Sequence, residues 1–243
     1  MNKPYNKGDD YEEKIFQICE KKKILARNFN RAGASDQSDI KILHQGKEFN
    51  VEIKADENAD YGQKYLKWEI KKGWQWVKDD NVTKMYNRMK IIENYINKNF
   101  IPKKFTKKKS EITNKDKRFD QINFEKPEIN IPLYTLFEYY LEKNCYYIQL
   151  ENCGFYHLKK DINNFGTSQF DGVITLRLRA KTINSTKKIY SKNKVGKKIR
   201  KDTGIPTPWN YGFLGVIKMS KKPSISNFDL QPINGRKFPK ILP

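Results

Sequence analysis

The chain has 243 residues, of which 37% are hydrophobic and 13% aromatic, and its formal net charge at pH 7 is +21. This length is enough for one large domain or for one domain with a small addition, and no run of about 18 apolar residues offers a membrane-spanning helix. Because the chain has only three cysteines and two histidines, neither a disulfide framework nor a zinc site is expected.

Lysine and arginine exceed aspartate and glutamate by 49 to 28, which indicates a polyanionic partner. Nucleic acid is favoured, because basic residues contact phosphates and aromatic residues stack on bases. A lysine-rich composition inherited from an AT-rich genome explains part of this excess but not the shortage of acids. The residues Met1–Tyr5 contain no apolar signal segment, so we expect a cytoplasmic protein that acts away from membranes.

The first expected element is a helix over residues 9–23. Two aspartates suit its N-terminus, and Ile15 and Cys19 recur at helical spacing on its apolar face. Glu12 lies toward that face, whereas Glu13 belongs to a solvent-facing stripe. Glu12 is therefore the candidate for an inward-facing carboxylate, and a helix-favouring N-terminal acid is the equally weighted alternative.

A β-hairpin is expected over residues 39–54, with a polar turn at His44–Glu48. Side chains alternate between the two faces of a strand. Glu52 and Lys54 therefore point to the same face of the second arm. The apolar residues of that arm point to the other face, into a core: Phe49, Val51 and Ile53.

Cross-strand pairing can bring Asp39, at the start of the first arm, next to Glu52. Two carboxylates and an ammonium on one sheet face are costly unless something compensates them, and a divalent cation does so naturally. Carboxylates suit Mg²⁺, which also binds substrate phosphate. Lys54 can then position or activate the attacking water. The alternative is a solvated hairpin face with an ordinary glutamate–lysine pair.

These residues resemble the PD-(D/E)xK nuclease superfamily. Asp39 resembles its first acidic residue, and Glu52-Ile53-Lys54 resembles its (D/E)-x-K element. Residues 33–35 resemble the family's Gly-rich lead into the first strand, and Ser38 stands where a proline is expected. The resemblance covers the first third of the chain and implies a metal-dependent phosphodiesterase, as in many type II restriction endonucleases. It also implies that Glu12 is a further metal ligand or contacts one.

Residues 55–66 are expected to form a turn that leads into a helix or strand, and residues 80–99 a helix. Gln63 resembles the glutamine that follows Glu-x-Lys in several of these nucleases, where it positions substrate or water. An ordinary polar surface residue is the alternative for it. Lys67 stands where one branch of the family has tyrosine, so the chain is not assigned to that branch. At least two of the four residues that follow or flank Gly73 are expected in the core rather than on a base-stacking surface: Trp68, Trp74, Trp76 and Val77.

Residues 102–118 contain eight lysines and arginines and are expected to form an exposed loop or arm. Such a run is either solvated or follows a DNA backbone. Pro132 favours the start of a helix over residues 133–141. A second hairpin is expected from residues 146–150 and 154–158.

A further strand is expected within residues 170–181. Its alternation forms a basic face suited to phosphates or guanine edges, with a plain solvent face as the equal alternative. The residues of this face are Arg177, Arg179 and Lys181.

A second basic stretch over residues 187–201 includes Lys197 and Lys198 and is expected to bind DNA and to be mobile without it. Residues 209–219 then form a last strand, and the tail is irregular.

The sequence thus predicts an α/β fold with a mixed central β-sheet flanked by helices, as in a restriction-endonuclease-like core, and a β-rich, basic C-terminal elaboration. We expect one domain over residues 1–243, with the catalytic core at about 9–100 and the DNA-gripping elaboration at about 101–243.

The expected function is a Mg²⁺-dependent endonuclease that cuts double-stranded DNA at a specific sequence, acting as a homodimer. Asp39 and Glu52 would bind the metal, and Lys54 and Glu12 would complete the catalytic set. No Gly-Lys-Ser/Thr phosphate loop is present, so no nucleotide cofactor is expected. The alternatives are a structure-selective repair or recombination nuclease and a non-enzymatic nucleic-acid-binding protein.

Overall fold

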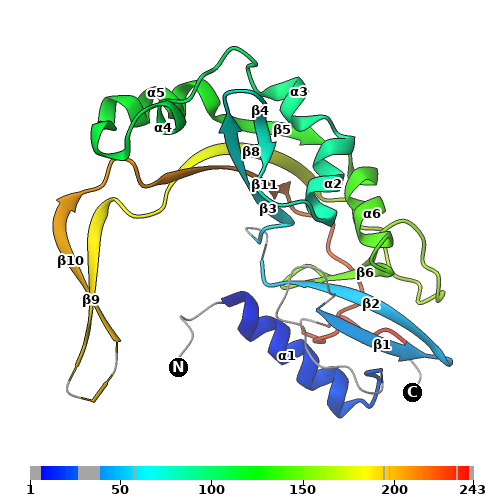
Figure 1. The fold of residues 1–243 in the computed structure, drawn as a ribbon. Coiled ribbons are helices and arrows are strands. Elements are labelled where there is room, and N and C mark those ends of the chain that lie inside the picture. Colours follow the sequence, from blue (N-terminus) through cyan, green and yellow to red (C-terminus); the bar gives the residue numbers. More distant parts are fainter. Residues whose placement is uncertain are drawn as a thin grey trace. The chain divides into compact units, whose positions relative to one another are not determined.

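The computed structural model describes residues 7–26, 39–56, 59–193, 195–196, 198–233 and 235–240. Figure 1 shows the helices and strands of these residues. In chain order they are α1 (Lys7–Lys21), β1 (Ile40–His44), β2 (Lys47–Lys54), β3 (Gly62–Glu69), β4 (Gly73–Trp76), α2 (Asn81–Arg88), α3 (Ile91–Tyr95), α4 (Lys103–Thr106), a 3₁₀ turn (Lys109–Glu111), α5 (Asn114–Phe124), β5 (Lys126–Ile131), α6 (Leu133–Leu141), β6 (Cys145–Leu150), β7 (Gly154–His157), β8 (Val173–Thr182), β9 (Thr186–Lys192), β10 (Lys198–Pro206) and β11 (Tyr211–Lys221).

The strands of the described chain form sheets in the orders β1-β2-β6-β7, β4-β3-β11-β8-β5 and β10-β9. In the first sheet β1 and β2 are antiparallel, β2 and β6 are parallel, and β6 and β7 are antiparallel. This sheet is therefore mixed, and the protein is an α/β protein rich in strands, which confirms the expected class.

The chain divides into two compact units. Unit 1 comprises residues 1–61, 130–175 and 217–243, and unit 2 comprises residues 62–129 and 176–216. None of the segments of these units ends near residue 100, where the catalytic core was expected to end. The reason is that β6, far along the chain, pairs with β2 and so joins the N-terminal hairpin to the middle of the sequence.

In unit 1, α1 packs against the hairpin of β1 and β2 (Figure 1). Ile15 and Cys19 on the apolar stripe of α1 are fully buried, as the helical spacing predicted. They share a core with the apolar residues of β2, and aromatic rings from later elements complete it. Its members from β2, β6, β7 and the segment that follows include Phe49, Val51, Ile53, Tyr147, Phe155 and Phe165.

In unit 2 the core is an aromatic cluster around Trp74. Its ring packs against Phe100, Phe124 and Phe213, with centroid distances of 5.9, 5.0 and 4.9 Å. Trp76 is partly buried and packs on Tyr86 at 4.7 Å. At least two core residues were expected from Trp68, Trp74, Trp76 and Val77, but only Trp74 is buried. Trp68 and Trp76 are partly buried and Val77 is exposed, so this expectation is wrong.

Several elements agree closely with expectation. Helix α6 matches the predicted range 133–141, and the second hairpin appears as β6 and β7. The helix expected over residues 80–99 is instead two helices, α2 and α3. Lys90 between them has a φ of 50°, a left-handed conformation that does not continue an α-helix.

The loop expected over residues 102–118 is wrong, because the segment forms α4, a 3₁₀ turn and the start of α5. A capping box between Thr113 and Asp116 begins α5. The buried Asp120 accepts hydrogen bonds from the backbone N–H groups of Lys103 and Lys104, at 2.7 and 2.9 Å. These side chain–backbone bonds stabilise helices in a segment whose high lysine content is also typical of an exposed loop.

The basic stretch over residues 187–201 contains strands, whereas its mobility without DNA stays a prediction. It contains β9 and the first part of β10, which pair with each other (Figure 1). It contains the β-branched and aromatic residues Ile189, Tyr190 and Ile199, which favour strands, but the high charge obscured this preference.

Candidate active site

The β1–β2 hairpin brings together the three residues of the sequence motif, Asp39, Glu52 and Lys54. Its turn consists of Gln45 and Gly46, with φ values of 49° and 75°, as a two-residue hairpin turn requires. The turn is shorter than predicted, since His44 and Lys47 already pair across it. The register that follows, with Ile40 opposite Val51, places Asp39 opposite Glu52 at the open end of the hairpin.

Asp39 is tied to β2 directly. Its Oδ2 atom accepts a hydrogen bond from the backbone N–H of Ile53 at 2.6 Å, which leaves Oδ1 for another ligand. Glu52 and Lys54 share the face of β2 opposite the core, and Lys54 Nζ lies 2.5 Å from Glu52 Oε1. The hairpin therefore places two carboxylates and one ammonium at its open end, as the alternation predicted.

Helix α6 and the turn after it add two residues that sequence reasoning missed. Tyr140 donates a hydrogen bond from its hydroxyl to Glu52 Oε1 at 3.2 Å. The buried Lys143 has its Nζ 3.9 Å from Glu52 Oε2. Both residues lie about 90 positions from Glu52 in sequence and approach it because β6 pairs with β2. No local pattern signals such a contact.

Electrostatics distinguish the two carboxylates. Burial, followed by the charges of Glu52 and Glu12, raises the pKa of Asp39 to about 8, although Lys54 and the Ile53 N–H act in the opposite direction. Burial alone would also raise the pKa of Glu52. The nearby ammonium groups of Lys54 and Lys143 outweigh it and hold that pKa below its ordinary value.

Lys54 is a stable ammonium in this environment. Burial alone would lower its pKa, but the charges of Glu52 and Asp39 outweigh burial and raise it above its ordinary value. The ring of Tyr61 lies nearby, with its centroid 5.8 Å from Lys54 Nζ. Lys54 is thus equipped to donate hydrogen bonds and positive charge rather than to accept a proton.

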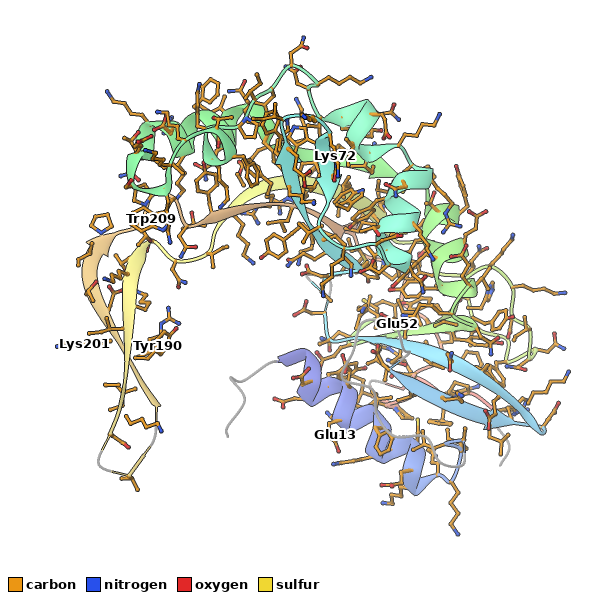
Figure 2. All side chains as sticks on the ribbon, in the orientation of Figure 1. Glu13, Glu52, Lys72, Tyr190, Lys201 and Trp209 are labelled. Carbon is orange, nitrogen blue, oxygen red and sulfur yellow. The ribbon has the colours of Figure 1, made fainter. Side chains whose placement is uncertain are left out.

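Glu12 of α1 is partly buried. Its charge contributes to the raised pKa of Asp39, so the two side chains are electrostatic neighbours. Glu13 lies elsewhere on the helix and accepts a hydrogen bond from Gln17 at 2.9 Å on an exposed surface. Figure 2 labels Glu13 on α1 and Glu52 on β2. The role of Glu12 as an inward-facing carboxylate stays a prediction.

The donor set fits a magnesium ion. Glu52 Oε2 is buried and accepts no hydrogen bond within the described residues, and Asp39 Oδ1 lies at the same end of the hairpin. In the described part of the chain, no group of three or more His, Cys, Asp or Glu side chains has a metal-binding arrangement. Mg²⁺ needs only one or two carboxylates, because waters and substrate phosphate supply its remaining ligands.

The predicted DNA-binding residues lie in unit 2. Gln63 is partly buried in β3. Arg177, Arg179 and Lys181 share one face of β8, while Leu176, Leu178 and Ala180, which alternate with them, are buried. Lys198 belongs to β10, and Lys197 lies outside the described residues. Their role in DNA binding stays a prediction.

Comparisons of the chain with family models, with curated proteins and with solved structures found no match. Among the helices of the described residues, none has both the length and the apolar character needed to cross a membrane.

Proposed function

We propose that the protein is a Mg²⁺-dependent endonuclease that hydrolyses phosphodiester bonds in double-stranded DNA. The observation that supports this most directly is the grouping of Asp39, Glu52 and Lys54 at the open end of one hairpin, with Lys54 Nζ 2.5 Å from Glu52. The chain's net charge of +21 favours a polyanionic substrate. Carboxylates beside an ammonium in such a chain suit phosphodiester hydrolysis.

Asp39 and Glu52 would hold the ion. When bound, Mg²⁺ supplies positive charge to the scissile phosphate and makes a bound water more acidic. Tyr140 and Lys143 keep the Glu52 carboxylate oriented and ionised. Lys54, as an ammonium, orients the attacking water and stabilises the negative charge that develops on the phosphate. Glu12 adds negative charge beside Asp39 and strengthens the site's attraction for a cation.

The finer proposal is a type II restriction endonuclease that cuts at a specific sequence. A homodimer is the simplest assembly that cuts both strands of a two-fold symmetric site, because each copy then contributes one catalytic hairpin. A structure-selective nuclease with the same catalytic residues is distinguished by its cleavage products.

The test is incubation of phage-sized duplex DNA with the protein, in Mg²⁺ and in chelator, followed by gel electrophoresis. We expect discrete, Mg²⁺-dependent fragments. Lys54→Met should lower the cleavage rate about 100-fold or more, because it removes a charge that acts in the transition state. Lys47→Met, at the exposed turn of the same hairpin, is the matched control and should cut normally.

Each other result has a definite meaning. A smear of Mg²⁺-dependent products would replace the restriction enzyme by a non-specific or structure-selective nuclease. DNA that is retarded but intact in every lane would contradict the enzyme proposal and leave a nucleic-acid-binding protein. Equal activity of Lys54→Met and Lys47→Met would remove Lys54 from the mechanism.

A further inference from the structure

Residues 186–206, here called the ribbon, form a two-stranded antiparallel sheet from β9 and β10. Its pairs run from Lys192 opposite Lys198 to Lys188 opposite Asp202. Its apolar and aromatic side chains are largely exposed: Ile189, Tyr190 and Ile199 are 46%, 57% and 46% exposed. The ribbon therefore contributes little to a hydrophobic core.

The ribbon has eight lysines and arginines and a single acid, Asp202. Two-stranded sheets are at best marginally stable in water, and like charges that face each other across strands destabilise them further. A strongly basic ribbon without core contacts is therefore costly for folding. Such a local conflict with folding is typical of a functional element.

Specific contacts nevertheless shape its base. Asp202 forms an ion pair with Lys188 and accepts a hydrogen bond from the Thr186 hydroxyl at 2.6 Å. Thr203 donates from its hydroxyl to the carbonyl of Lys187 at 2.8 Å. The pairing register shifts between Asp202 and Pro206, where Gly204 has a φ of 71°. The one acidic charge of the ribbon is thus paired with Lys188, and the ribbon has no acid to pair with its other basic residues.

The register assigns the side chains to two different faces. Tyr190 and Arg200 pair across one face, which we call the reading face. The same face contains Lys192 and, toward the base of the ribbon, the paired Lys188 and Asp202. The opposite, rear face contains Ile189, Ser191, Ile199 and Lys201. Figure 2 labels Tyr190 and Lys201, one residue from each face.

The reading face presents hydrogen-bond donors at its centre. Arg200 donates one hydrogen bond, from Nη2 to Asn184 Oδ1 at 3.2 Å. A guanidinium has five N–H donors, so others remain for a ligand. The Arg200 side chain is exposed. The centre of the rear face instead has two exposed isoleucines, which have no donors.

We propose that the ribbon binds in the major groove of duplex DNA, with its reading face toward the base edges and Arg200 bound to a guanine. This groove is about 12 Å wide and admits a two-stranded β-ribbon, and its guanines present the O6 and N7 acceptors that suit arginine. Lys187, Lys192 and Lys201 neutralise the flanking phosphates. The inference rests on the proposed function only in taking duplex DNA as the substrate, because groove binding requires no cleavage.

The test compares Arg200→Ala with Lys201→Ala in the Lys54→Met chain, in chelator, so that binding is measured without cleavage. These neighbouring residues lie on opposite faces, and each substitution removes one positive charge. The probe is a pool of short duplexes with a randomised central segment, from which bound molecules are sequenced. Arg200→Lys is a third variant that keeps the charge but loses the forked donor geometry. Circular dichroism checks that each variant is folded.

We expect the parent chain to select a motif that contains a guanine, with binding blocked by methylation of guanine N7. Arg200→Ala and Arg200→Lys should reduce the preference for that guanine about tenfold or more, whereas Lys201→Ala should weaken binding to all sequences alike. Any one of four results would overturn the inference. These are equal effects of Arg200→Ala and Lys201→Ala on sequence preference, binding that is insensitive to N7 methylation, selection of no motif, and preference for single-stranded DNA. So would loss of self-association, rather than of DNA binding, in the ribbon variants.

The outcomes separate the two proposals. If the native chain cuts DNA while Arg200→Ala and Lys201→Ala show the same sequence preference in binding, the ribbon inference is overturned and the nuclease proposal stands. If the chain selects a motif that depends on Arg200 but never cuts DNA, the ribbon inference stands and the nuclease proposal is overturned.

Discussion

Glu52 is buried, with 6% of its surface exposed, and yet its pKa is held below the ordinary value. A buried carboxylate is costly unless cations and hydrogen bonds compensate it. Lys54, Lys143 and Tyr140 supply this compensation from two distant segments of the chain. The charge balance of the site is therefore a property of several residues together, and double-mutant cycles should reveal their coupling.

We expect Lys143→Met to lower the free energy of unfolding by about 1–3 kcal/mol, because it leaves Glu52 less compensated. In a Glu52→Gln background the same substitution should cost much less, since the charge that Lys143 balances is gone. Denaturant unfolding of the four chains of this double-mutant cycle measures the difference. Lys84→Met, at an exposed position of α2, is the control and should be neutral in both backgrounds. A Lys143 effect of equal size in both backgrounds would mean that Lys143 acts by packing alone.

Asp39 should make the stability of the metal-free protein depend on pH. Its pKa is raised from 3.8 to about 8 on folding, so the folded state retains a proton that the unfolded state has lost. The stabilising contribution of this proton is complete below about pH 4 and is lost as the pH rises through about 8. Asp39→Asn, which stays neutral, should therefore be increasingly more stable than the native chain over this range, by about 1–3 kcal/mol at its upper end.

Thermal unfolding in chelator across this pH range measures the effect of Asp39→Asn. Addition of Mg²⁺ provides the internal control, because a cation should stabilise the native chain at high pH and have little effect on the variant. A stability difference that is constant with pH would show that Asp39 does not retain its proton in the folded state.

At the scale of elements, the turn between α6 and β6 determines where Lys143 lies. Asn50 of β2 donates a hydrogen bond from Nδ2 to the carbonyl of Lys143 at 2.6 Å, and its backbone N–H donates to the carbonyl of Asn144 at 3.0 Å. Asn144 itself has a φ of 54°, which asparagine tolerates better than most residues. One residue of β2 thus anchors the turn that places a second ammonium group near Glu52.

Asn50→Ala should therefore loosen this turn. We expect a loss of about 1 kcal/mol in the free energy of unfolding, the usual contribution of one hydrogen bond, and faster hydrogen exchange at the backbone amide of residue 50. Cleavage should also fall, because Lys143 is less well held. Asn94→Ala, which removes an exposed side-chain hydrogen bond at 3.4 Å in α3, is the matched control. Unchanged exchange at residue 50 would argue against the anchor.

At the scale of the whole molecule, the net charge of +21 should dominate binding to nucleic acid. If the protein neutralises six or more phosphates, its affinity for duplex DNA should fall by about 10³-fold or more between 50 and 200 mM salt. Fluorescence anisotropy with a short labelled duplex in chelator measures this dependence. Lys54→Met removes only one of 49 basic residues and should give nearly the same slope as the native chain. An affinity that is insensitive to salt would mean that the charge does not serve DNA binding.

The sequence by itself determined the elements whose signals are local. Alternation defined the face shared by Glu52 and Lys54, Gln45-Gly46 allowed a tight turn, and the apolar stripe of α1 identified its buried side. It was misleading over residues 102–118, where a high density of lysines obscured the capping pattern, and in the ribbon the same density obscured the preference for strands.

Only the tertiary structure decided which distant residues complete the site. Tyr140 and Lys143 reach Glu52 because β6 lies parallel to β2, and the ribbon acquires two chemically different faces because β9 and β10 pair in one register. The physical reason is the same in both cases. Sequence periodicity indicates which side chains of one helix or strand share a face. Which strands pair with each other depends instead on the free energy of the whole fold.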